Sequence, residues 1–422
     1  MPTKAITKLF ALKDGELKPA LMSGLLFFLI LCGYYILRPL REEMGLAGGV
    51  KNLPWLYLAN LAIMLALAPV FGAVATRWAR RTFIPAVYFF FMANMLMFYM
   101  AMKAIPPEGQ LLLGRVFYVW VSVYNMWAVS LFWAFMADSF GLERGKRLFG
   151  LIAVGGSLGA VLGSSITSIF VGIVGRPNLI LVSSVFMLLA AVVVIRLGRV
   201  MMAYGSTQSQ IPTPAQRGHF WSGISEFLRS PYLLAIGAYL FLFSLSSTFL
   251  YFEQAEIVNA IADTREAKAK IFANMDVWVN GLTFLIQIFL TGRLISKLGV
   301  GGVLIILPVL SVIGFLGLSF APVLPVLVVF QIARRATNYA LSRPARETLF
   351  TIVSRDQKYK AKSFIDTFVY RGGDMLGASA FAALGSLGIG LSGIALIAVP
   401  PALLWGGLGL FLGKKQKQLN KE

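Results

Sequence analysis

The residues of this chain that could do chemistry are charged side chains that lie inside apolar segments. Arg334 and Arg335 are adjacent in one such segment, and Arg371 and Asp374 lie in the segment that follows it. A charge near the centre of a bilayer costs at least ~2.5 kcal/mol, so it is retained where it faces water, a charged partner or a substrate. Because arginines predominate, and a guanidinium binds carboxylate and phosphate groups with two hydrogen bonds, the pattern predicts an anion site.

One group of candidate anion-binding residues lies at the end of the first apolar segment, which Arg38 is expected to close. Tyr34, Arg38 and Arg41 are spaced i, i+4 and i+7, which places them on one face of a helix. Two interpretations are open. The group is either an anion site beside an aromatic ring, or a membrane-edge anchor in which the arginines pair with Glu42 and Glu43.

The tenth apolar segment carries a second group. Arg334 and Asn338 are four residues apart and share a helix face. Two adjacent arginines cannot both face lipid cheaply. At least one of Arg334 and Arg335 is therefore expected to face a cavity or a carboxylate. The alternative is a buried ion pair with Asp366 or Asp374.

Acidic residues in the apolar segments are candidates for coupling or gating. Arg371 precedes Asp374 by three residues, a spacing that favours an ion pair along a helix. Asp374, Asp366 and Glu253 could take up a coupling proton or control a gate, and a purely structural role for each is open. Asp138, near the inner end of the fourth segment, is predicted to contribute to gate electrostatics.

Composition excludes an ordinary soluble domain. Hydrophobic residues make up 58% of the 422 residues, charged residues make up 13%, and the mean hydropathy is +0.77. A net charge of +20 would suggest nucleic-acid binding in a soluble protein. Here the basic residues fall mainly in short loops between apolar segments. Membrane topology explains them, and no nucleic-acid partner is expected.

Enzymatic and metal chemistry find no support in the sequence. Cys32 is the single cysteine, so no intramolecular disulfide can form. His219 is the single histidine and lies in a polar loop, which excludes a multi-histidine metal site and a histidine proton relay in the membrane. The sequence has no Walker loop and no Gly-x-Ser-x-Gly motif. The chain is therefore predicted not to be an enzyme and to hold no cofactor or metal.

About twelve apolar segments are long enough to cross a bilayer, which takes ~20 residues. They are 20–38, 53–76, 83–103, 111–138, 148–174, 178–195, 231–254, 271–291, 300–320, 323–350, 362–388 and 391–412. Pro344 is expected to bend the tenth segment or to end its passage. With both termini inside, 24 Lys and Arg residues lie on the inner side and 8 on the outer side. This bias predicts a multi-pass protein of the inner (plasma) membrane with cytoplasmic termini.

The polar stretch 196–230 divides the twelve segments into two sets of six. Its Gly, Ser, Thr, Gln and Pro content is typical of a linker. We therefore predict an N-terminal six-helix bundle over 1–195, a cytoplasmic linker over 196–230 and a C-terminal six-helix bundle over 231–422.

Two features of the first half recur in the second. A basic loop at 72–81 has a counterpart 220 residues later, at 292–301. Glycines spaced four apart, which let helices approach closely, recur after 218 residues. They are Gly155 and Gly159 in the fifth segment and Gly373 and Gly377 in the eleventh, with Gly163 matched by Phe381. The fifth helix, and less extensively the eleventh, is therefore predicted to have a closely packed glycine face.

The loop at 72–81 resembles the signature of the major facilitator superfamily, Gly-x-Leu-Ala-Asp-Arg-x-Gly-Arg-Arg/Lys. The matching positions are Gly72, Ala75, Arg77, Arg80 and Arg81. The resemblance implies an all-α membrane protein with twelve transmembrane helices in two pseudo-symmetric six-helix bundles, working by alternating access. It also implies that Arg77 and Arg80 help to latch a cytoplasmic gate, although Thr76 stands where the family has aspartate.

Short segments spread over most of the chain resemble the ATP/ADP translocases of plastids and intracellular bacteria. They are 34–45, 130–164, 249–261 and 343–378. Of four charged positions tied to nucleotide exchange in that family, Arg41 and Glu253 fall on two. Val121 or Ser122 replaces a glutamate, and Asp374 replaces a lysine, which reverses the charge. The resemblance implies the same scaffold with a different substrate or coupling scheme.

These observations predict a secondary active transporter that moves a phosphate- or carboxylate-bearing small molecule by alternating access, as a monomer in the lipid bilayer. Three alternatives are open. The first is an ATP/ADP-type nucleotide exchanger, which would be an antiporter. The others are a transporter of lipids or amphiphiles and a membrane partner that transports nothing.

Overall fold

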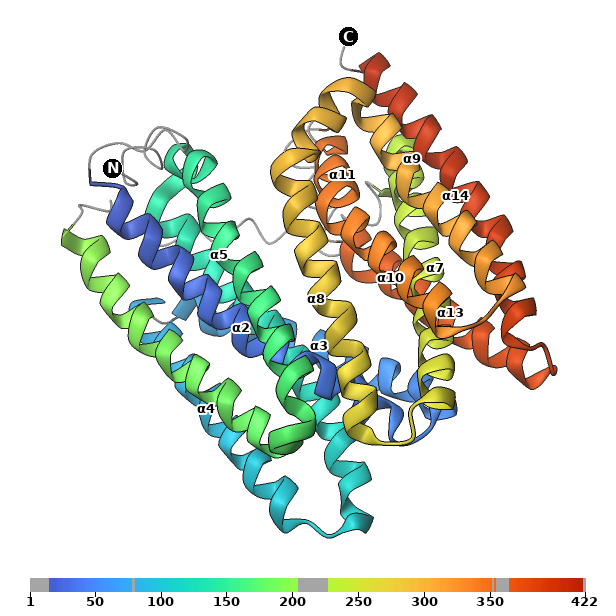
Figure 1. The fold of residues 1–422 in the computed structure, drawn as a ribbon. Helices are drawn as coiled ribbons and strands as arrows, with labels where there is room; N and C mark the ends of the chain where they lie inside the picture. Colours follow the sequence, from blue (N-terminus) through green and yellow to red (C-terminus); the bar gives the residue numbers. More distant parts are fainter. Residues whose placement is uncertain (1–14, 78–79, 204–226, 351–352, 354–363, 420–422) are drawn as a thin grey trace. The chain divides into compact units, whose positions relative to one another are not determined.

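The computed structural model describes residues 15–77, 80–203, 227–350, 353 and 364–419. Within these residues the chain forms helices and turns, and no β-strand (Figure 1). The predicted all-α class is confirmed.

The helices are long because the apolar segments that form them are long. The first half contains α2 (Leu17–Leu46), the 3-10 helix η1 (Val50–Asn52), α3 (Leu53–Arg77), α4 (Arg80–Ala104) and α5 (Pro107–Ala203). The second half contains α7 (Pro231–Ile261), α8 (Arg265–Phe289), α9 (Thr291–Phe320), α10 (Leu324–Thr337), the π-helix η2 (Asn338–Ser342), α11 (Arg343–Leu349), the π-helix η3 (Ile365–Val369), α13 (Tyr370–Ser386) and α14 (Leu391–Leu419).

The label α5 covers three membrane passes. A straight helix of 97 residues would be about 145 Å long, several times the ~30 Å thickness of a bilayer core. The ribbon instead turns back on itself (Figure 1). One break lies at Gly175, whose φ of 76° is in the left-handed region that glycine adopts without strain. This is the gap expected between the predicted segments 148–174 and 178–195.

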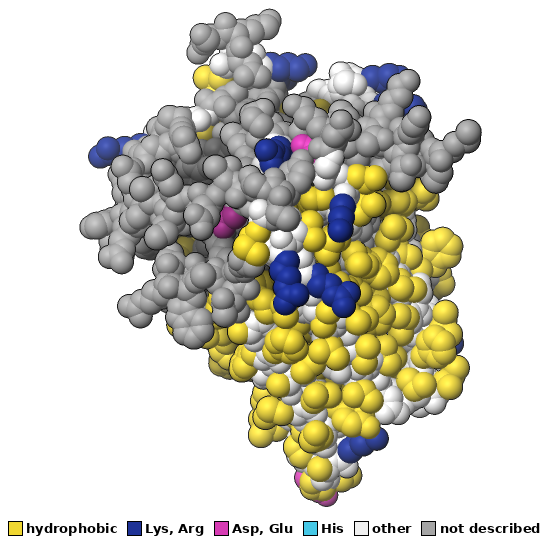
Figure 2. Space-filling view, turned by 90° about the vertical axis from the view of Figure 1, so that its left-hand side faces the viewer, with side chains coloured by type: hydrophobic (Ala, Val, Ile, Leu, Met, Phe, Trp, Pro, Cys, Tyr) yellow, Lys and Arg dark blue, Asp and Glu magenta, His cyan; other side chains and the backbone are white. Residues whose placement is uncertain are grey.

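Nine helical segments of the described residues are long and apolar enough to cross a membrane. One of them, Leu148–Met202, contains the two passes separated at Gly175. Two further passes, α10 to α11 and η3 to α13, are interrupted and carry charges. The described residues therefore account for twelve passes. Figure 2 shows one face of the molecule covered mostly by hydrophobic side chains, as a surface in contact with lipid requires.

Three predicted segment ends are wrong, in each case because the helix continues. α2 does not close at Arg38; it runs through Pro39 to Leu46. α7 runs to Ile261 and α5 to Ala203, so the stretch predicted as a linker begins in a helix. The rest of that stretch up to residue 226 lies outside the described residues. Packing of buried side chains on both sides of Pro39 compensates for the hydrogen bond that this proline removes.

The π-helix η2 explains how the tenth pass accommodates Pro344. A proline cannot donate to the carbonyl four residues before it, which here belongs to Ala340. Thr291 Oγ1 of α9 donates to that carbonyl at 2.8 Å. The widened turn and the side chain from α9 together let the segment continue into α11, so Pro344 interrupts this pass without ending it.

The chain folds into two compact units, which do not coincide with its two halves. Unit 1 contains residues 1–49, 59–213 and 263–277, and unit 2 contains residues 50–58, 214–262 and 278–422. The first half of α8 therefore belongs to unit 1, whereas the predicted C-terminal bundle contained all of it. The first turns of α3 belong to unit 2.

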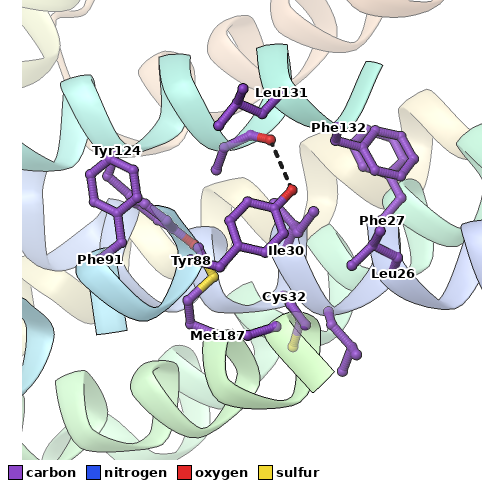
Figure 3. Packing of buried hydrophobic residues seen from close by; sticks show 14 of the residues in the cluster. Leu26, Phe27, Ile30, Cys32, Tyr88, Phe91, Tyr124, Leu131, Phe132 and Met187 are labelled. Atoms are coloured by element: carbon purple, nitrogen blue, oxygen red, sulfur yellow. Dashed lines mark hydrogen bonds between the residues drawn. The ribbon is translucent and has the colours of Figure 1, made fainter. Parts of the chain in front are cut away.

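Each unit has its own core. In unit 1, Tyr88 is fully buried and its hydroxyl donates to the carbonyl of Ala128 at 3.4 Å, beside Phe91 and Tyr124 (Figure 3). In unit 2, Trp405 is fully buried, with its ring centroid 5.5 Å from that of Tyr239. The hydroxyls of Tyr88 and Tyr239 each donate to a main-chain carbonyl, which lets these large rings fill an apolar core.

The glycine face predicted for the fifth pass is present in α5. A methyl group added at Gly155 would collide with the carbonyl of Gly24 in α2. The same addition at Gly159 would collide with the carbonyl of Phe28, and at Gly163 with that of Cys32. The backbones of α2 and α5 are therefore in direct contact along three turns, an approach that only glycine permits.

A shorter version of this contact joins α13 to α7 in unit 2. A methyl group at Gly373 would lie 2.7 Å from the carbonyl oxygen of Phe241, and one at Gly377 would lie 3.2 Å from that of Leu245. Phe381 takes the third position, and its ring packs 5.2 Å from that of Phe252. The repeat predicted from the glycine spacing is thus a repeated helix pair, and the face on α13 is shorter, as predicted.

Substituting leucine for Gly159 should prevent α2 and α5 from packing and abolish folding. A side chain of that size forces two contacting backbones apart, and overpacking of even a tolerant core costs ~1–3 kcal/mol. The yield and melting temperature of the purified protein in detergent measure the effect. Gly172→Leu is the matched control, because Gly172 is exposed on the same element with nothing within 4 Å of an added methyl group. Equal melting temperatures for both variants would contradict the role of the glycine face.

Candidate functional site

Arg38, a predicted anion-binding residue, has a protein carboxylate as its partner. Its Nη1 lies 2.5 Å from Oδ1 of Asp276, a residue of α8 that belongs to unit 1. The side chain of Asp276 is 3% exposed and that of Arg38 is 18% exposed. The guanidinium also lies 5.7 Å from the ring of Tyr35. Asp276 is 238 positions away in sequence, so helical spacing around Arg38 could not identify it.

Arg41 is held against α5. Its Nε donates to the carbonyl of Tyr118 at 3.2 Å and to Oγ of Ser122 at 3.1 Å, and its Nη1 lies 2.5 Å from Glu42 Oε1. The guanidinium stacks over the Tyr118 ring, with 3.9 Å from Cζ to the ring centroid. The pairing of Arg41 with Glu42, which was one of the two open interpretations, is therefore present. The ring of Tyr34 lies 6.4 Å from that of Tyr124.

Glu43 connects α2, α5 and α8 within unit 1. Its side chain is 1% exposed and lies 3.2 Å from Arg176 of α5 and 3.7 Å from Arg265 of α8. Arg176 also lies 3.2 Å from Glu266. With the Arg38–Asp276 pair, this network holds the first half of α8 against unit 1. Glu43 thus pairs with arginines of other helices, which the interpretation of a local pair with Arg38 or Arg41 did not anticipate.

Arg334 in unit 2 has a different environment. It is 4% exposed, near the end of α10. Its Nε donates to Ser311 Oγ of α9 at 3.2 Å, and its Nη2 donates to Ser247 Oγ of α7 at 2.8 Å and to the Phe243 carbonyl at 3.5 Å. All three acceptors are neutral. Within the described residues, Arg334 forms no ion pair with a carboxylate.

The ring of Phe243 gathers further groups beside Arg334. The Arg334 guanidinium carbon lies 5.5 Å from the ring centroid, and that of Arg346 in α11 lies 4.8 Å from it. The Tyr370 ring lies 5.9 Å away. Two guanidinium groups from the helices on either side of η2 therefore meet the rings of Phe243 from α7 and Tyr370 from α13 in unit 2. We call Phe243, Arg334, Arg346 and Tyr370 the Phe243 cluster.

Asn338 adds a polar atom one helical turn after Arg334. Its Oδ1 is buried and has no hydrogen-bond partner among the described residues. Buried polar atoms in proteins are nearly always satisfied, so an orphan acceptor beside a cationic cluster is consistent with a site that a ligand or water completes.

Asp374 is engaged by its own helix and by α7. Its Oδ2 lies 3.3 Å from Nη1 of Arg371, the pair that their spacing predicted. Its Oδ1 accepts hydrogen bonds from Ser244 Oγ and, at 3.1 Å, from Thr248 Oγ1. Within the described residues Asp374 is thus paired with Arg371 and not with Arg334, and the hydrogen bonds from Ser244 and Thr248 fasten α13 to α7.

Glu253 in α7 is fully buried, and neither of its carboxylate oxygens has a hydrogen-bond partner among the described residues. The other predicted residues are less informative. Arg335 and Asp138 are half-buried. The side chains of Arg77, Arg80 and Asp366 lie outside the part of the chain that the structure describes.

The predicted residues thus fall into two groups, one in each unit. Tyr34, Arg38 and Arg41 belong to unit 1, and Arg334, Arg335, Asn338 and Arg371 belong to unit 2. Sequence reasoning missed Asp276, Phe243, Ser247 and Ser311. A usable signal existed for Ser247, because the run Ser244 to Thr248 places several hydroxyl groups inside an otherwise apolar helix.

No protein-family model matches the sequence, and no curated protein does. Solved structures do match. The crystal structure of the nucleoside transporter NupG has a TM-score of 0.62 at 15% identity, covering 96% of this chain and 99% of that one. A bacterial homolog of the human lysosomal transporter Spinster, in an inward-facing and unoccupied conformation, has a TM-score of 0.57 at 15% identity, with the same coverage. At this identity the likeness concerns the fold, and the chain has the major facilitator fold that was predicted.

Replacing Asp276 alone should destabilise the protein more than replacing both Asp276 and Arg38. Asp276→Asn leaves a largely buried arginine without its counter-charge, a change that typically costs ~3–5 kcal/mol. Adding Arg38→Gln to that variant removes the unpaired charge and should restore part of the melting temperature. The two single variants and the double variant form a thermodynamic cycle, with Lys103→Gln at an exposed position of α4 as control. Strictly additive effects would contradict a direct pair.

Proposed function

We propose that this chain is a secondary active transporter that moves a small phosphate- or carboxylate-bearing anion by alternating access, with Arg334 as the main anion-binding residue. The fold supports this proposal, since the solved structures with which it is shared are those of transporters. The observation that supports an anionic substrate is the environment of Arg334.

An ionised arginine that is buried without a counter-charge is costly, and structures retain it where something compensates. Neutral oxygens of Ser311, Ser247 and Phe243 orient the guanidinium, and no carboxylate in the described part of the chain compensates its charge. An anionic substrate would supply the missing charge. In this proposal the hydroxyl groups of Ser311 and Ser247 orient Arg334, and the substrate is the counter-ion of Arg334.

The Phe243 cluster supports the same assignment. Arg346 brings a second guanidinium to the ring of Phe243, and two guanidinium groups suit a phosphate or carboxylate better than one. Asn338 offers an amide close to Arg334. Arg371 forms an ion pair with Asp374, so we assign it a structural role and not a role in substrate binding.

The predicted role of Arg38 and Arg41 in substrate binding changes in this proposal. Arg38 is paired with Asp276 and Arg41 with Glu42, so an anion would have to displace a carboxylate to reach either one. We assign both to holding unit 1 and the first half of α8 together. Placement in the inner membrane, with both termini in the cytoplasm, remains part of the proposal.

Nucleotide exchange is the second candidate function. It rests on the matches of Arg41 and Glu253 to charged positions of the ATP/ADP translocases, and NupG, which has the same fold, is a nucleoside transporter. Counterflow of labelled ATP against ADP in proteoliposomes tests it directly. Uptake of ADP alone, without a nucleotide inside, would point to net transport in place of exchange.

The anion site can be identified and tested with purified protein. A thermal-shift screen against nucleotides, sugar phosphates and organic acids selects a stabilising anion. Arg334→Ala should then weaken its binding by ~1.5–3 kcal/mol, roughly 10- to 150-fold, because a charge-assisted hydrogen bond is lost. Arg334→Lys should recover part of the affinity, since lysine keeps the charge but lacks the planar fork. Calorimetric titration measures both.

Arg293→Ala is the matched control, because Arg293 is an exposed arginine of the same unit. The melting temperature of each variant without ligand separates loss of binding from loss of folding. Unchanged affinity in a folded Arg334→Ala variant would overturn the assignment of Arg334.

A further inference from the structure

Glu253 is a buried acidic residue that takes no part in the proposed anion site. It is fully buried in α7, and both carboxylate oxygens lack a hydrogen-bond donor among the described residues. Asp374 provides the contrast, with three donors from Ser244, Thr248 and Arg371 around its two oxygens. Two acids that were equivalent candidates by sequence therefore have opposite surroundings.

Charged groups on the elements around α7 do not compensate Glu253. These elements are α10, α13, α14, η1 and η3. Their charged residues are Arg334 and Arg335 in α10, Arg371 and Asp374 in α13, Lys414, Lys415 and Lys417 in α14, Lys51 in η1, and Asp366 in η3, whose side chain is not described. None of the described ones donates to Glu253 or forms an ion pair with it. Glu256, one turn along α7, is half-buried.

A carboxylate without donors or cations cannot remain ionised away from water without a large penalty, whereas the neutral acid can. The geometry around Glu253 therefore fits the protonated form. Its helix also carries the anion site, because Phe243 and Ser247 contact Arg334. Glu253 lies six residues after Ser247, about 9 Å along the axis and on a different face.

We infer that Glu253 binds a proton in this conformation and is the residue through which the proposed transport is coupled to protons. The inference rests on the proposed function for its coupling part only. Proton uptake converts the carboxylate to the neutral acid as Glu253 becomes buried, and its exposure to water in another conformation releases the proton. Asp374 is then a structural residue. One helix connects the proton to the anion, without direct contact between the two.

Infrared spectroscopy of the purified protein in lipid tests the proton directly and needs no substrate. At neutral pH the wild type should show a carbonyl band of a protonated carboxylic acid that shifts when H2O is exchanged for D2O. The band should be absent from Glu253→Gln, which resembles the neutral acid in shape. It should persist in the control Asp374→Asn. A wild-type spectrum without the band, or a Glu253→Gln spectrum that retains it, would overturn the inference.

The pH dependence of stability gives a second readout. A proton bound by the folded protein, and released by the unfolded chain at neutral pH, makes the free energy of unfolding fall as the pH rises. The melting temperature of the wild type should therefore decrease between neutral and alkaline pH more steeply than that of Glu253→Gln. Parallel slopes would contradict proton binding at Glu253. Neither experiment involves Arg334, so loss of the anion site in the Arg334 variants remains a separate test of the proposed function.

Discussion

The cost of an unpaired charge away from water governs where the charged side chains of this protein lie. Arg38, Glu43 and Arg371 meet opposite charges from other helices or from their own helix. The Arg38 and Glu43 pairs join separate helices of unit 1, whereas the Arg371–Asp374 pair lies within α13. Arg334 and Glu253 do not follow this pattern. Among the described residues neither has a counter-charge, and this distinguishes them as candidates for binding an anion and a proton.

Close contact between helix backbones is the second constraint, and it sets the positions of the groups around the site. The glycines of α13 bring α7 near enough for Ser244 and Thr248 to reach Asp374. An adjacent face of α7, about 100° around the helix, presents Phe243 and Ser247 to Arg334 of α10. Different faces of α7 contact α13 and α10. Ser244 and Thr248 therefore bind Asp374 of α13, whereas Ser247 orients Arg334 of α10.

The π-helices η2 and η3 adjoin this site in the chain. η2 separates Arg334 from Arg346, and η3 ends directly before Tyr370. A π turn changes the angular position of every residue that follows it. The π turn interrupts the regular helical spacing between residues 334 and 346. The changed register after η2 lets Arg334 and Arg346 both lie beside the Phe243 ring. Such wide turns are frequent at functional sites, which suits the Phe243 cluster.

Much of the fold could be predicted from the sequence, because the determining patterns are local. Apolar length gives the passes, four-residue spacing gives the glycine faces, and three-residue spacing gives the Arg371–Asp374 pair. The helix ends were predicted less well. α2 continues for two more turns after Arg38, because buried side chains on both sides of Pro39 stabilise the helix there. The proline itself predicts a stop, and only the neighbouring helices overcome it.

The sequence by itself determined which charges enter apolar segments and which residues share a helix face, because both depend on neighbours within a few turns. Tertiary structure decided which of those charges find partners on other helices. The partner of Arg38 lies 238 positions away, and a hydroxyl that orients Arg334 lies 87 positions away. Helical periodicity carries no information over such separations. The division between paired structural charges and unpaired functional candidates therefore depends on how the helices pack.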